Sequence, residues 1–155
     1  MTQPFADYDR HDALGLAALV RRREASAAEL LEAAIDRIER LNPRINALTL
    51  KLYERARTAI TRGLPQGPFA GVPFVLKDLG QMLKGERLAT GSRLFADYVP
   101  AKDSTLAQRF EAAGLVIAGK SSTPELGCSI TTEPAGPSRV QPGDPSMSPD
   151  SRIGG

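Results

Sequence analysis

The first apolar residues of the chain have the spacing of a short helix. Leu16, Leu19 and Val20 fall on one helical face, and Asp12 stands where a side chain can cap the helix start. Three arginines at 21–23 follow, at the position where cations favour the carboxyl end of a helix. We interpret them as a solvated helix end and not as a phosphate site, because no aromatic residue or second basic cluster accompanies them.

A second, more strongly marked helix is predicted to begin after Ser26. Ser26 and Glu29 have the spacing of a capping box. The apolar residues that follow at helical intervals are Leu30, Leu31, Ala34, Ile35, Ile38 and Leu41. We expect the helix to stop at Asn42 and Pro43. A strand or turn at 46–50 and a third helix at 53–61 complete this part of the chain.

From residue 69 the pattern changes to that of an α/β unit. The compact apolar run at 72–76 predicts a strand buried on both faces, and Lys77 stands at its end. Asp103 or Ser104 then caps a helix that Gly114 ends, and 115–118 predicts a second short buried strand. The apolar side of that helix is predicted to hold Leu106, Phe110 and Ala113. A strand, a helix and a strand in this order indicate a crossover between parallel strands, and hence the α/β class.

Composition changes after Glu133. The segment 134–155 holds five of the chain's 12 prolines and only scattered apolar residues. Such a segment buries too little to offset the entropy of ordering it. We therefore expect one domain at 1–133, followed by a mobile tail at 134–155.

The overall composition excludes several kinds of function. With 155 residues, of which 41% are hydrophobic, the chain can bury one modest core. The net charge of +2 is too small to indicate a nucleic-acid or membrane partner, and without a leader or spanning segment we expect a cytoplasmic protein. Because Cys128 and His11 are single residues of their kinds, they cannot form a zinc site together, and we expect neither a metal nor a cofactor.

Two segments have the residues of a functional site, but their sequence context argues against a functional role. The segment 114–121 has the spelling of a P-loop, but residues 115–118 have the pattern of a strand where a phosphate-binding loop is required. Cys128 could act as a nucleophile only with His11, which is far away in the sequence. We interpret Cys128 as a small buried thiol.

Lys77 is the third candidate, and its local pattern allows two interpretations. Next to an apolar strand, desolvation disfavours the ammonium form and can free the amine to act as a base. Alternatively, Lys77 extends into solvent or pairs with Asp78. The local pattern favours the second interpretation.

A set of ordered segments changes this balance. In order and spacing they strongly resemble the amidase-signature family, and the resemblance extends from Asp12 to Pro134. The segments are Gly71-Val72-Pro73-Phe74-Val75-Leu76-Lys77-Asp78, Gly91-Ser92, Asp103-Ser104-Thr105, Ala113-Gly114-Leu115-Val116-Ile117-Ala118-Gly119-Lys120, Thr123-Pro124-Glu125-Leu126-Gly127 and Thr131-Thr132-Glu133-Pro134. Ser121 and Ser122 differ from the Thr-Asn pair that is common in the family.

The resemblance implies a mixed sheet flanked by helices and an amidase that uses a serine, a cis-serine and a lysine. Lys77 matches the lysine, whose neutral amine would accept the proton of the nucleophilic serine through the cis-serine. Backbone amides of a glycine-rich loop would stabilise the oxyanion. The implied partner is a small-molecule amide, and a homo-oligomer is compatible with these features.

The two serine-bearing stretches of the family do not occur in the 155 residues. Gly136-Pro137-Ser138-Arg139 still resembles the family's loop, but 140–153 loses the pattern and Gly154-Gly155 stand where a serine is expected. We therefore expect an incomplete amidase that is inactive by itself. The alternative is a noncatalytic interaction module or a degenerate fragment, with an open sheet edge that binds a partner.

Overall fold

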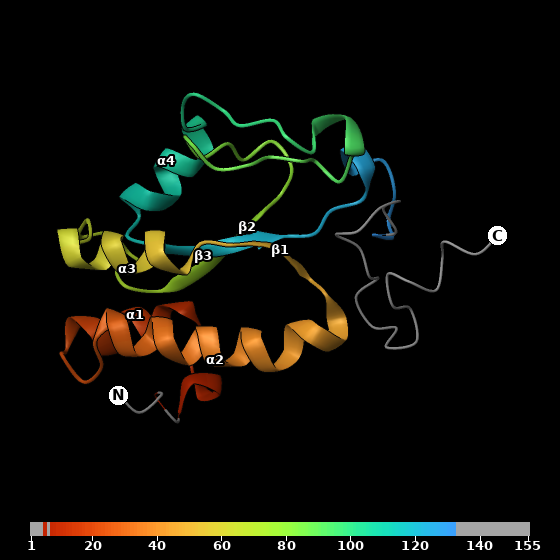
Figure 1. Cartoon of the computed structure of the whole chain (residues 1–155). Coiled ribbons are helices and arrows are strands. Elements are labelled where there is room, and N and C mark those ends of the chain that lie inside the picture. The colour runs from red at the N-terminus through yellow and green to blue at the C-terminus, as the bar shows by residue number, and fades with distance from the viewer. Residues whose placement is uncertain (1–4, 6, 133–155) are drawn as a thin grey trace.

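The computed structural model describes residues 5 and 7–132, which form a mixed sheet covered by helices (Figure 1). The boundary at 133 and the mobile tail predicted at 134–155 concern residues outside the described range. The described elements are η1 (Tyr8–Arg10), α1 (Ala13–Arg21), α2 (Ala27–Ile45), β1 (Leu48–Lys51), α3 (Tyr53–Arg62), β2 (Pro73–Lys77), η2 (Arg93–Phe95), α4 (Thr105–Ala112), β3 (Val116–Ser121) and η3 (Glu125–Gly127).

The starts of α1 and α2 are capped as the sequence predicts. The amide of Gly15 donates to Asp12 Oδ1 over 2.7 Å at the start of α1. At the start of α2, the Glu29 amide donates to Ser26 Oγ over 3.2 Å, and the Ser26 amide donates to Glu29 Oε2 over 2.8 Å. Both caps satisfy backbone donors that have no partner inside the helix.

The predicted end of α2 at Asn42 and Pro43 is wrong, because the helix continues to Ile45. A proline so close to the helix end removes one amide donor, and the helix can tolerate that loss. Asn46 ends α2 in the left-handed conformation, with φ of 44°, and its amide donates to the Asn42 carbonyl over 2.7 Å. The Asn42 side chain also accepts from the amide of Leu48, so it connects α2 to β1.

The sheet has the order β1-β3-β2, with β2 parallel and β1 antiparallel to β3. The parallel pair confirms the predicted crossover through α4. The central strand β3 is buried from Val116 to Lys120. The prediction that 72–76 is a strand buried on both faces is wrong for most of β2, which lies at the edge of the described sheet, with Pro73, Phe74 and Val75 only half-buried.

Apolar side chains pack on both faces of the sheet. On one face, Val116 and Ala118 pack with α2 and α3, and on the other Ile117 and Leu76 pack with Ala107 of α4. The predicted core position of Leu106 is wrong, because its side chain is 45% exposed. Successive helical residues are turned by about 100°, so a helix that buries Ala107 and half-buries Phe110 directs Leu106 outwards.

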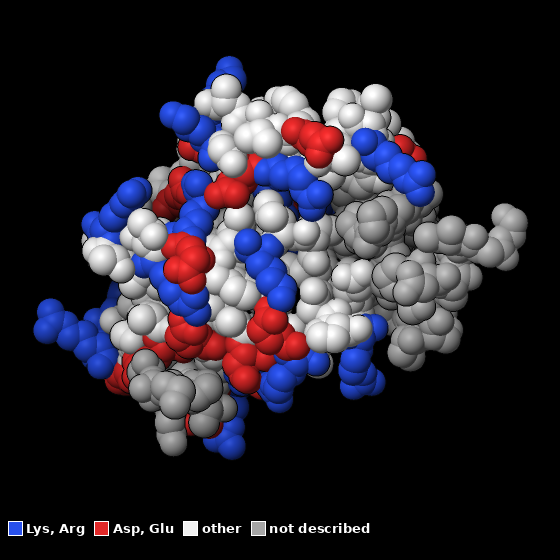
Figure 2. Space-filling model, viewed as in Figure 1, with Lys and Arg blue, Asp and Glu red and all other residues white. Residues whose placement is uncertain are grey.

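The described surface carries both signs of charge close together. Figure 2 shows basic and acidic side chains interspersed over one face. Many of these charges are paired, including Arg57 with Glu32 at 2.8 Å and Lys51 with Glu39 at 2.8 Å.

None of the described helices is long and apolar enough to cross a bilayer.

Candidate functional site

Lys77 is the last residue of β2, and its side chain is exposed. Side chains alternate along a strand, so Lys77 points to the face opposite buried Leu76. Its register partner across the parallel pair is Ser121. Within the described part of the chain, the Lys77 amine makes no hydrogen bond or ion pair. The described residues therefore place the amine in solvent and do not desolvate it as the first interpretation of Lys77 required.

The alternative pairing of Lys77 with Asp78 is wrong, because Asp78 turns inwards and faces Lys120. Asp78 is only 3% exposed, Lys120 is fully buried, and Asp78 Oδ1 lies 3.6 Å from Lys120 Nζ. The two residues come directly after β2 and from the end of β3. The pairing accounts for the burial of both residues, because charged groups are rarely fully buried unless they have a partner.

The loop that follows β2 completes the surroundings of this pair. Lys120 Nζ donates to the carbonyl of Arg87 over 2.6 Å. The amide of Ala89 donates to Asp78 Oδ2 over 3.3 Å. Asp78 Oδ1 accepts no hydrogen bond from the described residues, so its main interaction is the attraction of Lys120.

Burial controls the electrostatics of the Asp78–Lys120 pair. It lowers the pKa of Lys120, although the negative charge of Asp78 acts in the opposite direction. It also raises the pKa of Asp78, against the attraction of Lys120 and the hydrogen bond from Ala89. The two shifts agree, because each shows that the loss of hydration exceeds the attraction between the charges.

Sequence reasoning missed this pair. The signal was a lysine two residues after the apolar run 115–118, where a buried strand leaves little access to solvent. The partner could not be identified from the sequence, because Asp78 meets Lys120 only once β2 and β3 lie side by side.

Residues 116–121 of the segment with the P-loop spelling form β3, and the sequence context had predicted a strand here. Gly119 and Lys120 both lie within β3. A side chain on Gly119 would place its Cβ 2.7 Å from the carbonyl oxygen of Leu50. The glycine therefore permits close strand packing and does not form a phosphate-binding loop.

The interpretation of Cys128 as a buried thiol is wrong, because its side chain is exposed. Cys128 directly follows η3, and its thiol lies 3.7 Å from the carbonyl oxygen of Leu126. His11 is also exposed. Among the residues that the structure describes, no group of three or more His, Cys, Asp and Glu side chains is arranged to hold a metal ion.

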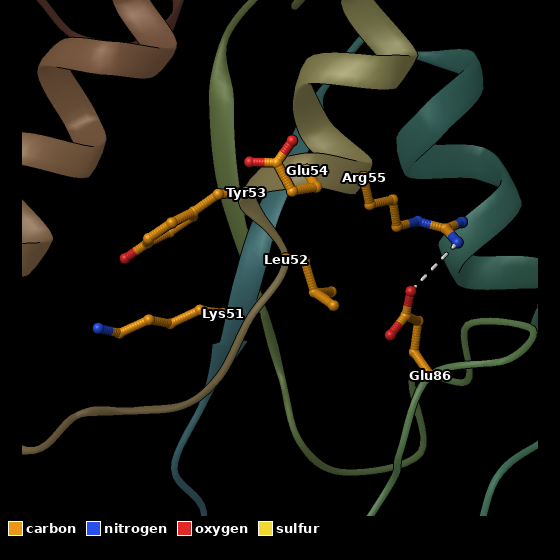
Figure 3. Close-up of a pocket in the computed structure, with 6 residues that line it drawn as sticks. All are labelled: Lys51, Leu52, Tyr53, Glu54, Arg55 and Glu86. Carbon is orange, nitrogen blue, oxygen red and sulfur yellow. Dashed lines mark ion pairs between the residues drawn. The ribbon is translucent and has the colours of Figure 1, made fainter.

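A separate hollow of about 350 Å³ lies where β1 meets α3, and Lys77 is not among its lining residues. Figure 3 shows the side chains that line it, with Arg55 pointing towards Glu86 at a distance of 3.9 Å. Arg55 also pairs with Glu111 at 3.1 Å, and Lys51 pairs with Glu39. Because protein carboxylates already pair with both of these cations, we assign no ligand to this hollow.

Comparison with known proteins gives a consistent result. A family model described as Amidase matches residues 29–149. The 6-aminohexanoate-cyclic-dimer hydrolase of Paenarthrobacter ureafaciens is 43% identical over 125 residues, which cover 79% of this chain and 25% of that protein. A glutamyl-tRNA(Gln) amidotransferase subunit of Salinispora tropica is 38% identical over 134 residues, covering 82% of this chain and 27% of that protein.

The fold agrees with these matches. A solved structure of 6-aminohexanoate cyclic dimer hydrolase complexed with substrate superposes with a TM-score of 0.77 and 40% identity. The superposition covers 84% of this chain and 27% of that protein. The chain thus spans about a quarter of the length of the relatives that it matches.

Proposed function

The chain belongs to the amidase family, and from this premise we propose that it contributes Lys77 to a site that hydrolyses amide bonds. The observation that supports this proposal best is the position of Lys77. It ends the strand within the segment 71–78, beside the end of the neighbouring parallel strand. Residues at the carboxyl ends of parallel strands are common places for catalytic groups.

In the proposed site Lys77 acts as a base. Its neutral amine accepts a proton through the cis-serine from the nucleophilic serine, whose oxygen attacks the amide carbonyl. The C–N bond then breaks, the leaving amine takes up the proton, and water hydrolyses the acyl-enzyme and regenerates the serine. For this, the amine must become less hydrated than it is among the described residues. We propose that the serine-bearing part of the site covers Lys77 and excludes water from its amine, which favours the neutral form.

We propose a small linear or cyclic amide as the substrate. The hydrolase that acts, by its name, on the cyclic dimer of 6-aminohexanoate is 43% identical, and the amidotransferase chain is 38% identical. The difference in identity is small, but it has the same direction as the resemblance of residues 73–79, Pro-Phe-Val-Leu-Lys-Asp-Leu, to stand-alone amidases more than to the amidotransferase subunit. The cytoplasmic location and the absence of a nucleic-acid partner stay predictions from the sequence.

The 155 residues by themselves are expected to lack amidase activity, because the family's two serine-bearing stretches do not occur among them. Without a nucleophile, Lys77 has no proton to accept. The measurement is hydrolysis of simple aliphatic and aryl amides by the purified chain. Turnover above the uncatalysed rate that disappears in Lys77→Ala would contradict this expectation.

The role of Lys77 can be tested by joining residues 1–132 to the serine-bearing remainder of the 6-aminohexanoate-cyclic-dimer hydrolase. Lys77→Ala should lower kcat for the cyclic dimer by at least about 10²–10⁴-fold, the usual contribution of a positioned proton acceptor. Lys102→Ala is the matched control, because Lys102 is an exposed lysine outside the segment 71–78. A folded chimera with Lys77→Ala and near-parental kcat, or a folded parent chimera with no turnover, would show that the proposal is wrong.

A further inference from the structure

We propose that Asp78 and Lys120 form a positioning pair for Lys77, which fixes the ends of β2 and β3 and the loop at 87–92 in one arrangement. This inference rests on the proposed function of Lys77. It assigns a role to two buried residues that make no contact with the amine itself.

The pair connects three segments that are distant in the sequence. In addition to the contact between the Asp78 and Lys120 side chains, the backbone amide of Asp78 donates to the carbonyl of Ser121 over 3.0 Å. The side chains then reach the loop, since Asp78 accepts from the Ala89 amide and Lys120 donates to the Arg87 carbonyl. Breaking the pair would release the ends of both strands and the loop together.

The same loop is also held on its other side. The amide of Leu126 donates to the carbonyl of Thr90 over 2.9 Å, and Ser92 Oγ donates to Glu125 Oε1 over 2.7 Å. Gly91 has a φ of 69°, and a Cβ there would lie 2.5 Å from the carbonyl oxygen of Thr123. The loop at 87–92 therefore packs closely against the chain that follows β3, and the Asp78–Lys120 pair connects it to the strand ends.

Lys77 depends on this arrangement because its own side chain has nothing to orient it. The amine is exposed and makes no hydrogen bond within the described residues. Among these residues it is therefore positioned only through the backbone, which sets the direction of the Cα–Cβ bond. That backbone is anchored by Leu76, which is fully buried, and by Asp78, which is 3% exposed. Of these two anchors, only Asp78 is held by a charge and hydrogen bonds.

The energetics also indicate a role in specifying geometry. Burial raises the pKa of Asp78 and lowers that of Lys120, in each case against the attraction between the two charges. Apolar residues of similar volume often replace such pairs with no loss of stability. An ion pair at this position is therefore better explained by the single geometry that it selects than by its contribution to stability.

Hydrogen exchange in the 155-residue chain tests the inference without any need for activity. The variants are Asp78→Asn and Lys120→Met, singly and together, with Lys102→Met as the matched control. In the double variant, which leaves no unpaired buried charge, we expect the amides of residues 78 and 89 to exchange at least about tenfold faster. The amide of Val116, which donates to the Val72 carbonyl in the same sheet, should keep its parental rate.

Each result of this experiment has a defined meaning. Faster exchange at residues 78 and 89 alone supports a positioning pair. Unchanged exchange rates would overturn the inference, because the pair would then have no local effect. An equal increase at all three amides would also overturn it, because the pair would then only stabilise the whole domain. A double variant that does not fold would overturn it as well, since the pair would then be a requirement of the fold.

The chimera described above separates this inference from the proposed function. The double variant should lower kcat by about tenfold or more with KM within about twofold, because misplacing a catalytic group affects the chemical step most. If Lys77→Ala abolishes turnover and the double variant keeps parental kcat, the positioning pair is wrong and the proposed function stands. If Lys77→Ala keeps parental turnover, the proposed function itself is wrong, whatever the exchange rates show.

Discussion

Two lysines at the ends of neighbouring strands have opposite surroundings. Lys77 is exposed, whereas Lys120 is fully buried and lies against Asp78 and the carbonyl of Arg87. The sequence resemblance indicates a catalytic role for Lys77 and none for Lys120. In the structure, burial lowers the pKa of Lys120, so loss of hydration alone does not identify the amine that we propose as the base.

Removal of the two side chains should therefore have different effects on stability. Lys120→Ala leaves the Asp78 carboxylate buried without its partner, and we expect it to lower the free energy of unfolding by about 3–5 kcal/mol. Lys77→Ala removes an exposed side chain and should change it by no more than about 0.5 kcal/mol. Urea unfolding of both variants, followed by circular dichroism, measures the difference.

Equal stability of the two variants would contradict this prediction and would mean that water reaches Asp78 once Lys120 is removed. The comparison also decides which lysine can serve as a control for activity. Because Lys120 supports the fold, its removal is not a neutral control for Lys77→Ala, whereas exposed Lys102 is suitable.

At the scale of elements, α2 is stabilised by its capping box. The box satisfies two backbone donors at Ser26 and Glu29, and the hydrogen bonds from Ser26 also lower the pKa of the Glu29 carboxyl. We expect Ser26→Ala to lower the free energy of unfolding by about 1 kcal/mol, the usual cost of losing such a cap. The measurement is the urea midpoint at neutral pH.

Thr58→Ala is the control for this cap, because Thr58 is an exposed residue inside α3 and caps no helix. It should leave the midpoint nearly unchanged, since surface substitutions away from special features have small effects. If Ser26→Ala were as mild as Thr58→Ala, the capping box would be a geometric feature with little energetic weight.

The sequence predicted the elements whose signals are local. The caps at Asp12 and Ser26 and the parallel pairing of β2 and β3 are confirmed. The caps depend on residues near one another in the chain, and the pairing follows from a general rule of chain connection. Pro43 misled the prediction, since the rule that proline stops a helix does not hold for its last turn.

Other features depended on tertiary contacts and could not be predicted from spacing. The apolar run 72–76 looks the same whether a strand is central or at an edge, and only the order β1-β3-β2 decides which. Cys128 was expected to be buried from its residue type alone. The likeness to amidases pointed to Lys77, but the role of Lys77 stays a prediction.

At the scale of the whole described fold, bonds between charged side chains connect the helices to one another and to β1. Arg57 of α3 donates to both carboxyl oxygens of Glu32 in α2, over 2.8 and 2.9 Å. Glu39 of α2 accepts from Lys51 Nζ over 2.8 Å, at the end of β1. Asp9 accepts from Arg37 over 2.8 Å and connects η1 to α2. The pKa of each of these three carboxyls is lowered, first of all by these hydrogen bonds.

These lowered pKa values predict a loss of stability in acid. A carboxyl whose pKa is lower in the folded chain stabilises the fold above its unfolded pKa, which is 4.5 for glutamate. The contribution is then lost as the pH falls through the folded pKa. The raised pKa of Asp78 acts in the opposite direction, because protonation removes the cost of its buried charge. A single variant is therefore needed to isolate one carboxyl.

Glu32→Gln provides this test, because it keeps the shape of the side chain and removes the charge that Arg57 binds. We expect the parent to lose more of its free energy of unfolding between pH 7 and pH 3.5 than the variant does. The difference should be about 0.2–1 kcal/mol, as for other partly exposed pairs. Urea unfolding at the two pH values gives the four free energies, and Asp78 contributes equally to parent and variant, so its effect cancels. Equal losses in both proteins would mean that the Glu32–Arg57 pair contributes nothing to the connection between α2 and α3, which would then rest on packing and on the hydrogen bond from Tyr53 to Glu39.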